Sequence, residues 1–225
     1  GFDIIGNASV LLSQSEIYNN SSTRGAGIYI LGEQAILTLT DVTIRDNTST
    51  GPGGAISCAN GATVNVLGES AIHHNEATLG GGIHADNSCQ VTGRSGDNLP
   101  ALQVEKGIFA NTAEQGGGIY LSDGATLLLE GNSEHPASVV FNTSNIDDSS
   151  EGGGGFFITG NNTRLDAINA RVDANIAQYF GGGGVVLDRA VFTMHRAEGP
   201  CWSDEYCSSI SYNFVTGVEG VGGAI

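Results

Sequence analysis

The stretch ILTLTDVTIRDNTSTGPGGAI, residues 36–56, contains three features that recur along the chain. Apolar residues at alternate positions come first, starting at Leu37. An aliphatic residue with an asparagine three positions later follows, at Ile44 and Asn47. A glycine-rich triplet that ends at an apolar residue, Ile56, closes the unit. Because the three features return in the same order, the sequence indicates a tandem repeat.

Seven copies of this unit run through the sequence. The spacing between glycine motifs is 28 residues from Ile28 to Ile56 and 27 from there to Ile83, and it then varies from 29 to 40. The motif asparagines are Asn20, Asn47, Asn75, Asn111, Asn142, Asn175 and Asn213. The longer spacings predict insertions, which we place at residues 93–100, 131–136, 147–152, 199–208 and 214–220.

Each copy is expected to form three short strands. Strands of this length cannot bury their apolar faces alone, so stacking of one copy on the next is required. The sequence therefore predicts an all-β, right-handed parallel β-helix with about seven three-stranded turns and no terminal caps, the handedness following the rule for parallel crossovers. The residues expected to point inward after the glycines are Ile28, Ile56, Ile83, Ile119, Phe156 and Val185.

Two corners of the predicted coil are marked by residue type. The asparagines are expected to stack at one corner, because an amide can donate and accept along a column and asparagine tolerates a left-handed backbone. Glycine is expected at the next corner, where it permits positive φ and close approach of successive turns. The glycines assigned to that corner are Gly27, Gly54, Gly82, Gly118, Gly155, Gly184 and Gly223.

Composition limits the function classes. The chain has 225 residues, 35 of them glycine, and a formal net charge of −16. This charge argues against nucleic acid or an anionic membrane as a partner. No apolar run approaches the length of a membrane-spanning helix, so direct membrane insertion by this segment is not expected. Apolar residues make up 40% of the chain, enough to fill a core.

At the glycine and asparagine motifs, the sequence resembles the repeats of the chlamydial polymorphic outer-membrane proteins, whose signatures are GGAI and FxxN. The motifs that carry the resemblance include GGAI at residues 53–56 and IRDN at residues 44–47, where Ile replaces the aromatic residue. The resemblance implies a β-helical passenger, an extracellular or cell-surface location and a role in adhesion. It also implies that residues 1–225 are a segment of a larger protein.

Catalysis on a β-helix would require clustered carboxylates, or carboxylate-bound calcium with a basic residue, on one lateral face. The acidic candidates are Asp147, Asp148, Glu151, Asp204 and Glu205. They lie in predicted insertions, and no two repeats place paired carboxylates with a basic residue at matching strand positions. We therefore expect no catalytic residues and no cofactor, although calcium stays open.

The adjacent pair His73 and His74 suggests a metal site. Strand alternation predicts that the two side chains face opposite ways, which favours ordinary variation of a surface column. The glycine runs at residues 152–155 and 181–184 resemble phosphate loops, but they precede strands and recur in every copy. The repeat corner explains them.

Two cysteine pairs are candidates for disulfides. Cys201 and Cys207 lie close together in an irregular stretch, where they form either a small disulfide-closed loop or two exposed thiols. Cys58 and Cys89 are expected to face inward near the same corner of adjacent turns. They form either a disulfide or two buried thiols.

The surface offers further candidates. Trp202, Tyr206 and Tyr212, in or near the largest insertion, are the predicted contact surface. Sequons for N-glycosylation, relevant if the source is eukaryotic, occur at Asn7, Asn19, Asn20, Asn47, Asn142 and Asn161.

These observations predict a non-enzymatic extracellular β-solenoid that serves as a stalk, filament block or adhesive passenger. Its expected partners are more of its own chain or other solenoid subunits end to end, and a host or surface receptor or glycan. A carbohydrate-active enzyme and a self-assembling solenoid subunit are the alternatives.

Overall fold

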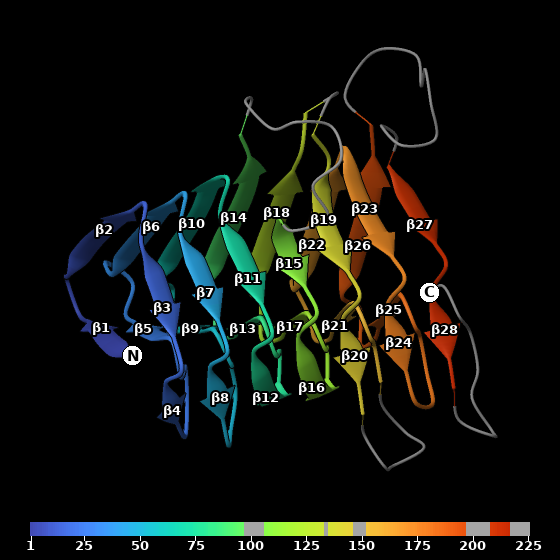
Figure 1. Ribbon diagram of the computed structural model, residues 1–225, viewed down its shortest axis with the longest axis horizontal. Coiled ribbons are helices and arrows are strands. Elements are labelled where there is room, and N and C mark those ends of the chain that lie inside the picture. Colours follow the sequence, from blue (N-terminus) through green and yellow to red (C-terminus); the bar gives the residue numbers. More distant parts are fainter. Residues whose placement is uncertain (97–105, 133–134, 146–151, 197–207, 217–225) are drawn as a thin grey trace.

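A computed structural model describes residues 1–96, 106–132, 135–145, 152–196 and 208–216. These residues form a coil of parallel strands and contain no helix. Each turn of the coil, here called a rung, contributes one strand to each of four sheets. The seven rungs follow one another in chain order along the coil (Figure 1). The predicted parallel β-helix is confirmed.

The first sheet follows the glycine motifs. Its strands are β1 (Phe2–Ile5), β5 (Ile28–Leu31), β9 (Ile56–Ala59), β13 (Ile83–Ala85), β17 (Ile119–Leu121), β21 (Phe156–Ile158) and β25 (Gly184–Val186). Strand neighbours are in direct register, so Ile28, Ile56, Ile83 and Ile119 stack in one column. All four side chains are fully buried, because alternate residues of a strand face the same side.

The second sheet carries the alternating apolar pairs. Its strands are β2 (Ser9–Ser13), β6 (Ile36–Thr40), β10 (Thr63–Gly68), β14 (Gln90–Ser95), β18 (Thr126–Glu130), β22 (Arg164–Ile168) and β26 (Val191–His195). Leu37 and Leu39 point inward and are buried, while Thr38 and Thr40 between and beside them are half-buried on the outer face.

The third sheet leads into the corner asparagines. Its strands are β3 (Glu16–Tyr18), β7 (Thr43–Arg45), β11 (Ala71–His73), β15 (Gly107–Phe109), β19 (Ala137–Val140), β23 (Ala170–Asp173) and β27 (Ser209–Ser211). One aliphatic residue of each strand points inward, as Ile44, Ile72 and Ile108 do.

A fourth sheet corrects the prediction of three strands per rung. Its strands are β4 (Ser21–Ser22), β8 (Thr48–Ser49), β12 (Glu76–Leu79), β16 (Thr112–Gln115), β20 (Thr143–Ser144), β24 (Ile176–Ala177) and β28 (Phe214–Val215). Its inward residues are small, for example Ser49, Ala77 and Ala113. Strands this short with small inward residues produce no apolar alternation in the sequence, so three strands were expected.

The glycine corner also differs from the prediction. Within the described residues, positive φ occurs at the glycine three positions before the inward residue that opens each strand from β5 to β25. The nominated glycines of this part of the chain do not adopt positive φ. These positive-φ glycines are Gly25, Gly53, Gly80, Gly116, Gly153 and Gly181. Gly27, Gly82 and Gly118 instead permit close approach, because a Cβ there would lie 2.6 to 2.7 Å from a backbone oxygen of the next rung.

One register assignment at this corner was wrong. Gly184 lies inside β25 opposite Phe156, and Val185 pairs with Phe157, so Gly184 rather than Val185 continues the inward column. The side chain of Phe156 occupies the space that Gly184 leaves, since a Cβ on Gly184 would come within 2.6 Å of Phe156 Cδ2. The large Phe156 in one rung and the small Gly184 in the next thus fill the core together.

The asparagine corner differs in its backbone. The corner asparagines do not adopt positive φ, whereas the residue before each of them does, with φ between 52° and 57°. These positions are Asn19, Asp46, His74, Ala110, Phe141, Ala174 and Tyr212. Asparagine was expected to supply a left-handed backbone, but the left-handed residue precedes it.

Two insertions begin later than predicted. Residues 93–95 belong to β14, where Gly93 and Arg94 pair with Leu129 and Glu130 of β18. Residues 214–215 form β28, which pairs with β24. Much of the predicted insertions lies outside the described residues. In the described part of the chain, no helix is long and apolar enough to span a bilayer.

Candidate binding surface

The corner asparagines form a hydrogen-bonded ladder along the coil. The backbone N–H and the side-chain Nδ2 of Asn75 both donate to Oδ1 of Asn111, each at 3.0 Å. Nδ2 of Asn111 then donates to the backbone oxygen of Ile72 and to Oδ1 of Asn142. The same amide-to-amide bond joins every successive pair from Asn20 to Asn213. Asn47, Asn75, Asn111, Asn142 and Asn175 are buried.

This ladder determines which residues face solvent at the corner. Because each asparagine side chain points inward, the residues immediately before and after it lie on the outside. In the first three rungs these flanking pairs are Asn19 and Ser21, Asp46 and Thr48, and His74 and Glu76. In the last three rungs they are Phe141 and Thr143, Ala174 and Ile176, and Tyr212 and Phe214.

The flanking residues of the last three rungs create an apolar corner patch, which we define as Phe141, Ile176, Tyr212 and Phe214. Their exposed fractions are 52%, 37%, 78% and 55%. Ile176 and Phe214 are register partners in the fourth sheet. Phe141 and Tyr212 occupy one column two rungs apart, a separation of about 10 Å at the usual strand spacing. Apolar side chains exposed together in this way commonly mark an interaction site.

The outer face of the third sheet carries an aromatic stripe, which we define as Tyr18, Arg45, His73 and Phe109. These four residues share one register column across the first four rungs. The guanidinium of Arg45 lies 4.4 Å from the ring centroid of Tyr18, and the rings of His73 and Phe109 stack with centroids 4.6 Å apart. Arg45 also pairs with Glu16 and Asp46, so its charge is balanced locally.

A known protein family matches one segment of the chain, in the second and third rungs. Residues 41–59 match the Chlamydia polymorphic membrane protein repeat. This segment runs from just before β7, through the corner at Asn47, to the end of β9. No curated protein and no solved structure gives a significant match to the chain. The polymorphic membrane protein repeat belongs to a family of chlamydial outer-membrane surface proteins.

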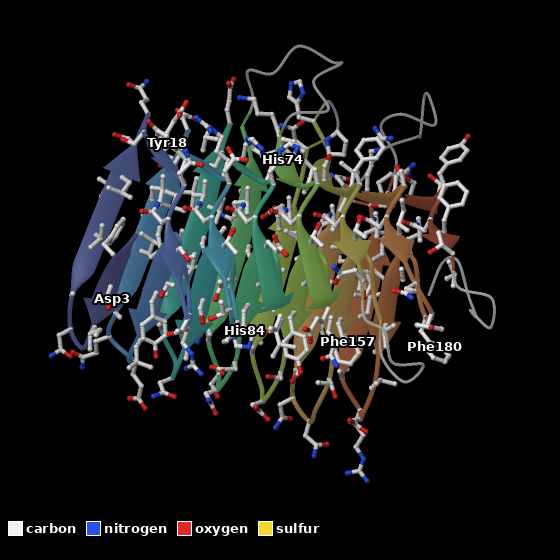
Figure 2. All side chains as sticks on the ribbon, turned by 60° about the horizontal axis from the view of Figure 1, so that its bottom comes forward. Asp3, Tyr18, His74, His84, Phe157 and Phe180 are labelled. Carbon is white, nitrogen blue, oxygen red and sulfur yellow. A yellow bond between two sulfur atoms is a disulfide. The ribbon has the colours of Figure 1, made fainter. Side chains whose placement is uncertain are left out.

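A second outer column, on the first sheet, is buried at His84 and Phe157 and half-buried at Tyr120. His84, Tyr120 and Phe157 stack in consecutive rungs, with centroids 5.4 and 5.3 Å apart. Figure 2 shows His84 and Phe157 on the side of the coil opposite Tyr18 and His74. Burial, followed by the charge of Arg24, lowers the pKa of His84 to about 4. The Nδ1 atom of His84 finds no hydrogen-bond partner among the described residues.

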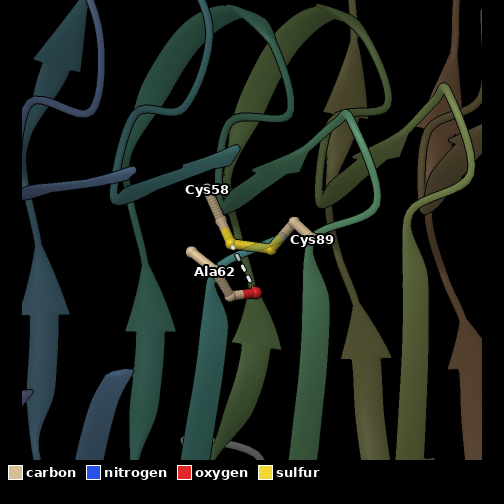
Figure 3. Close-up of a disulfide and its surroundings, with 3 residues drawn as sticks. All are labelled: Cys58, Ala62 and Cys89. Atoms are coloured by element: carbon tan, nitrogen blue, oxygen red, sulfur yellow. Dashed lines mark hydrogen bonds between the residues drawn. A yellow bond between two sulfur atoms is a disulfide. The ribbon is translucent and has the colours of Figure 1, made fainter. Parts of the chain in front are cut away.

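A disulfide joins the third and fourth rungs. Cys58 in β9 and Cys89 just before β14 are bonded, with Cα atoms 5.9 Å apart (Figure 3). Both side chains are fully buried, and Sγ of Cys58 lies 3.7 Å from the backbone oxygen of Ala62. Of the two alternatives for this pair, the structure contains the disulfide. Cys201 and Cys207 lie outside the described residues.

The sequons are not equivalent. Asn47 and Asn142 are buried and their amides are used in the ladder, so neither can be an acceptor in the folded coil. Asn20 is half-buried and also belongs to the ladder. Asn7, Asn19 and Asn161 are exposed. Folding of the coil therefore removes the sequons at Asn47 and Asn142 from the surface.

The remaining predicted site residues separate by location. Tyr212 is exposed and belongs to the apolar corner patch, whereas Trp202, Tyr206 and Gly223 lie outside the described residues. The acidic candidates Asp147, Asp148, Glu151, Asp204 and Glu205 lie outside them too. Within the described ranges, no group of three or more His, Cys, Asp or Glu residues could hold a metal ion.

Sequence reasoning missed most of the apolar corner patch. Phe141, Ile176 and Phe214 were not nominated, although the sequence carries a signal for them. The triplets centred on the corner asparagine change from NNS, DNT and HNE to FNT, ANI and YNF along the chain. The sequence also predicted that His73 and His74 face opposite ways. The structure brings their rings together, because His74 has positive φ and no longer follows strand alternation.

Proposed function

We propose that this chain is a non-enzymatic, rigid segment of a cell-surface protein, and that it adheres to a surface receptor or glycan through the apolar corner patch. The observation that carries the proposal is the exposure of Phe141, Ile176, Tyr212 and Phe214 on adjacent columns of consecutive rungs. The match of residues 41–59 to a repeat of surface proteins supports the setting.

Rigidity makes the patch suitable for binding. The asparagine ladder and the parallel strands fix the backbone on both sides of each exposed side chain. Association costs less free energy when the contact residues are already ordered. Aromatic side chains at the centre of an interface commonly contribute most of the binding energy. Tyr212 and Phe214 are therefore the expected anchors.

Charge narrows the class of partner. The formal net charge is −16, and several of the cationic side chains are already paired, as in Arg94 with Glu130 and Lys106 with Glu69. A neutral or cationic surface would meet no repulsion, whereas a polyanionic one would. We propose a protein receptor or a neutral glycan as the ligand class, and not nucleic acid.

The proposal is tested by coating fluorescent beads with the protein and counting the beads that remain on cultured epithelial cells after washing. Beads coated with albumin are the control. We expect retention above the albumin level and no release of reducing ends from acidic polysaccharides by the soluble protein. Turnover of any such polysaccharide, or retention equal to that of albumin, would contradict the proposal.

A further inference from the structure

The side chains of His73 and His74 meet on the exposed face of the third rung. Their Nδ1 atoms lie 2.7 Å apart, and the two rings are nearly perpendicular, at 83°. His73 is half-buried and His74 is exposed, and Figure 2 places His74 on the outside of the coil. Two imidazole nitrogens are thus directed toward one another at the protein surface.

Both rings are held by the surrounding rungs. The ring of His73 stacks on Phe109 of the next rung, with an interplanar angle of 13°. The backbone of His74 is fixed in the left-handed region, and its N–H donates to the backbone oxygen of Ala110 at 3.1 Å. The carbonyl of His73 accepts from Nδ2 of Asn75 in the ladder. The pair is therefore ordered before any ligand arrives.

The separation of the two nitrogens fits one class of metal ion better than others. Two nitrogens bound to the same ion at about 2.05 Å lie about 2.9 Å apart at a right angle and about 3.3 Å apart at the tetrahedral angle. The observed 2.7 Å is a hydrogen-bond separation, so the nitrogens must move apart by about 0.2 Å and both rings must turn until the two lone pairs converge on the ion. Imidazole and oxygen donors at right angles are typical of Cu²⁺ and Ni²⁺.

We propose that His73 and His74 form a bidentate site for a divalent copper or nickel ion, with water in the other positions. In the free protein, one Nδ1 carries the hydrogen that the other accepts. When the ion binds, this proton moves through solvent to Nε2 of the same ring. Both rings stay neutral, and each offers its Nδ1 lone pair to the ion.

The charges around the pair are compatible with a cation. Arg45 is the register neighbour of His73, but it is paired with Glu16 at 3.0 Å and with Asp46 at 2.7 Å. Glu76 follows in β12 and is exposed on the same corner. The carboxylates near this corner offset the cation of Arg45, so an incoming metal ion does not meet an unbalanced positive charge.

The site is tested by calorimetric titration of tag-free protein with NiCl₂, followed by visible absorption during titration with CuSO₄. We expect one ion per chain at this site. His73→Gln and His74→Gln should each weaken binding by at least roughly tenfold, because each removes one of two ligands. His195→Gln, which removes an exposed single histidine at the end of β26, is the matched control and should leave the affinity unchanged.

A second set of measurements separates coordination from general surface binding. Phe109→Ala keeps both imidazoles but removes the ring that orders His73, so it should weaken binding by a smaller factor than either histidine change. A tenfold excess of Ca²⁺ should not compete, because calcium prefers oxygen ligands. Absence of binding by the wild-type protein, or wild-type affinity in both His73→Gln and His74→Gln with unchanged circular dichroism, would overturn the proposal.

Discussion

The first three and last three rungs have the same corner interior but opposite corner exteriors. Asn47 and Asn142 make equivalent ladder bonds, and both are fully buried. On the outside, Asp46 and Thr48 flank the first, while Phe141 and Thr143 flank the second. The amide ladder is thus compatible with charged, polar or aromatic neighbours. Fold and surface chemistry are determined by different positions of the same repeat.

This independence has a geometric cause. The residue before each corner asparagine adopts positive φ whether it is Asp46, Ala110 or Tyr212. A left-handed backbone at a residue other than glycine costs roughly 1–2 kcal/mol. The ladder offsets this cost at every rung, so the outward side chain can vary without loss of the corner.

The largest expected effect comes from breaking the ladder inside the coil. Asn111→Ala would remove the side-chain acceptor of the Asn75 N–H and the side-chain donor to the oxygen of Ile72. Nδ2 of Asn75 would keep its bonds to the oxygens of Ile44 and His73, and Oδ1 of Asn142 would keep the backbone N–H of residue 111. Buried groups deprived of partners cost about 1–3 kcal/mol each, so we expect a loss of about 3–5 kcal/mol in the free energy of unfolding. Urea denaturation followed by circular dichroism measures this loss.

The same change at the first rung is the matched comparison. Asn20 is only half-buried and bonds to Asn47 alone along the ladder. Asn20→Ala should therefore cost about 1 kcal/mol. Equal losses for Asn20→Ala and Asn111→Ala would show that the buried ladder is not what stabilises the corner.

The disulfide at the boundary between the two halves should have the next largest effect. The pair Cys58→Ala and Cys89→Ala removes a cross-link across 31 residues. The chain-entropy model predicts a loss of about 3.7 kcal/mol in the free energy of unfolding. Urea midpoints of the double variant and of the reduced wild-type protein should agree. A double variant as stable as the oxidised protein would contradict this expectation.

A decrease in pH should lower the free energy of unfolding, because His84 in the middle rungs becomes protonated. Its pKa is lowered to about 4, so the folded state binds fewer protons than the unfolded chain, and stability falls as the pH decreases from 6.5 toward 4. The shift of His84 corresponds to roughly 3 kcal/mol. The pKa of Asp86, which is raised mainly by burial, contributes in the opposite direction. Arg24 and Asp123 are the other charges that act on these groups.

His84→Phe isolates this contribution, because phenylalanine retains the stack on Tyr120 and cannot be protonated. Urea midpoints measured at pH 7 and at pH 4.5 should differ less for His84→Phe than for the wild-type protein. An identical pH dependence in the two proteins would show that His84 does not titrate in this range.

The interior could be predicted well from the sequence, because its residues recur at the same place in every copy of the repeat. The inward column from Ile28 to Ile119 and the buried asparagines could be read from the spacing of the motifs. The fourth sheet could not, since Ser49 and Ala77 are too small to produce an apolar pattern. The left-handed residues before the asparagines were missed for a similar reason. Positions as different as Asp46 and Phe141 share a backbone conformation but no residue type.

The outer surface was harder to predict than the interior. To predict the apolar corner patch, one must know that the residues on both sides of each asparagine face outward. This follows from the inward direction of the amide and not from composition. Tyr212 was nominated because of its neighbouring insertion, whereas Phe141 and Phe214 were not. The meeting of His73 and His74 depends on one backbone angle, which the sequence does not reveal.

Bead adhesion after an exchange of corner residues is the most direct test of the proposed role of the apolar corner patch. The variant Phe141→Asp, Ile176→Thr, Tyr212→Asn and Phe214→Ser gives the last three rungs the polar residues of the first two. The control variant Asn19→Ala, Ser21→Ala, Asp46→Ala and Thr48→Ala changes the equivalent positions of those two rungs. With thermal midpoints close to wild type, we predict that the patch variant falls to the albumin level while the control adheres normally. Unchanged adhesion of the patch variant, or an equal loss of adhesion in the patch variant and the control variant, would contradict this role.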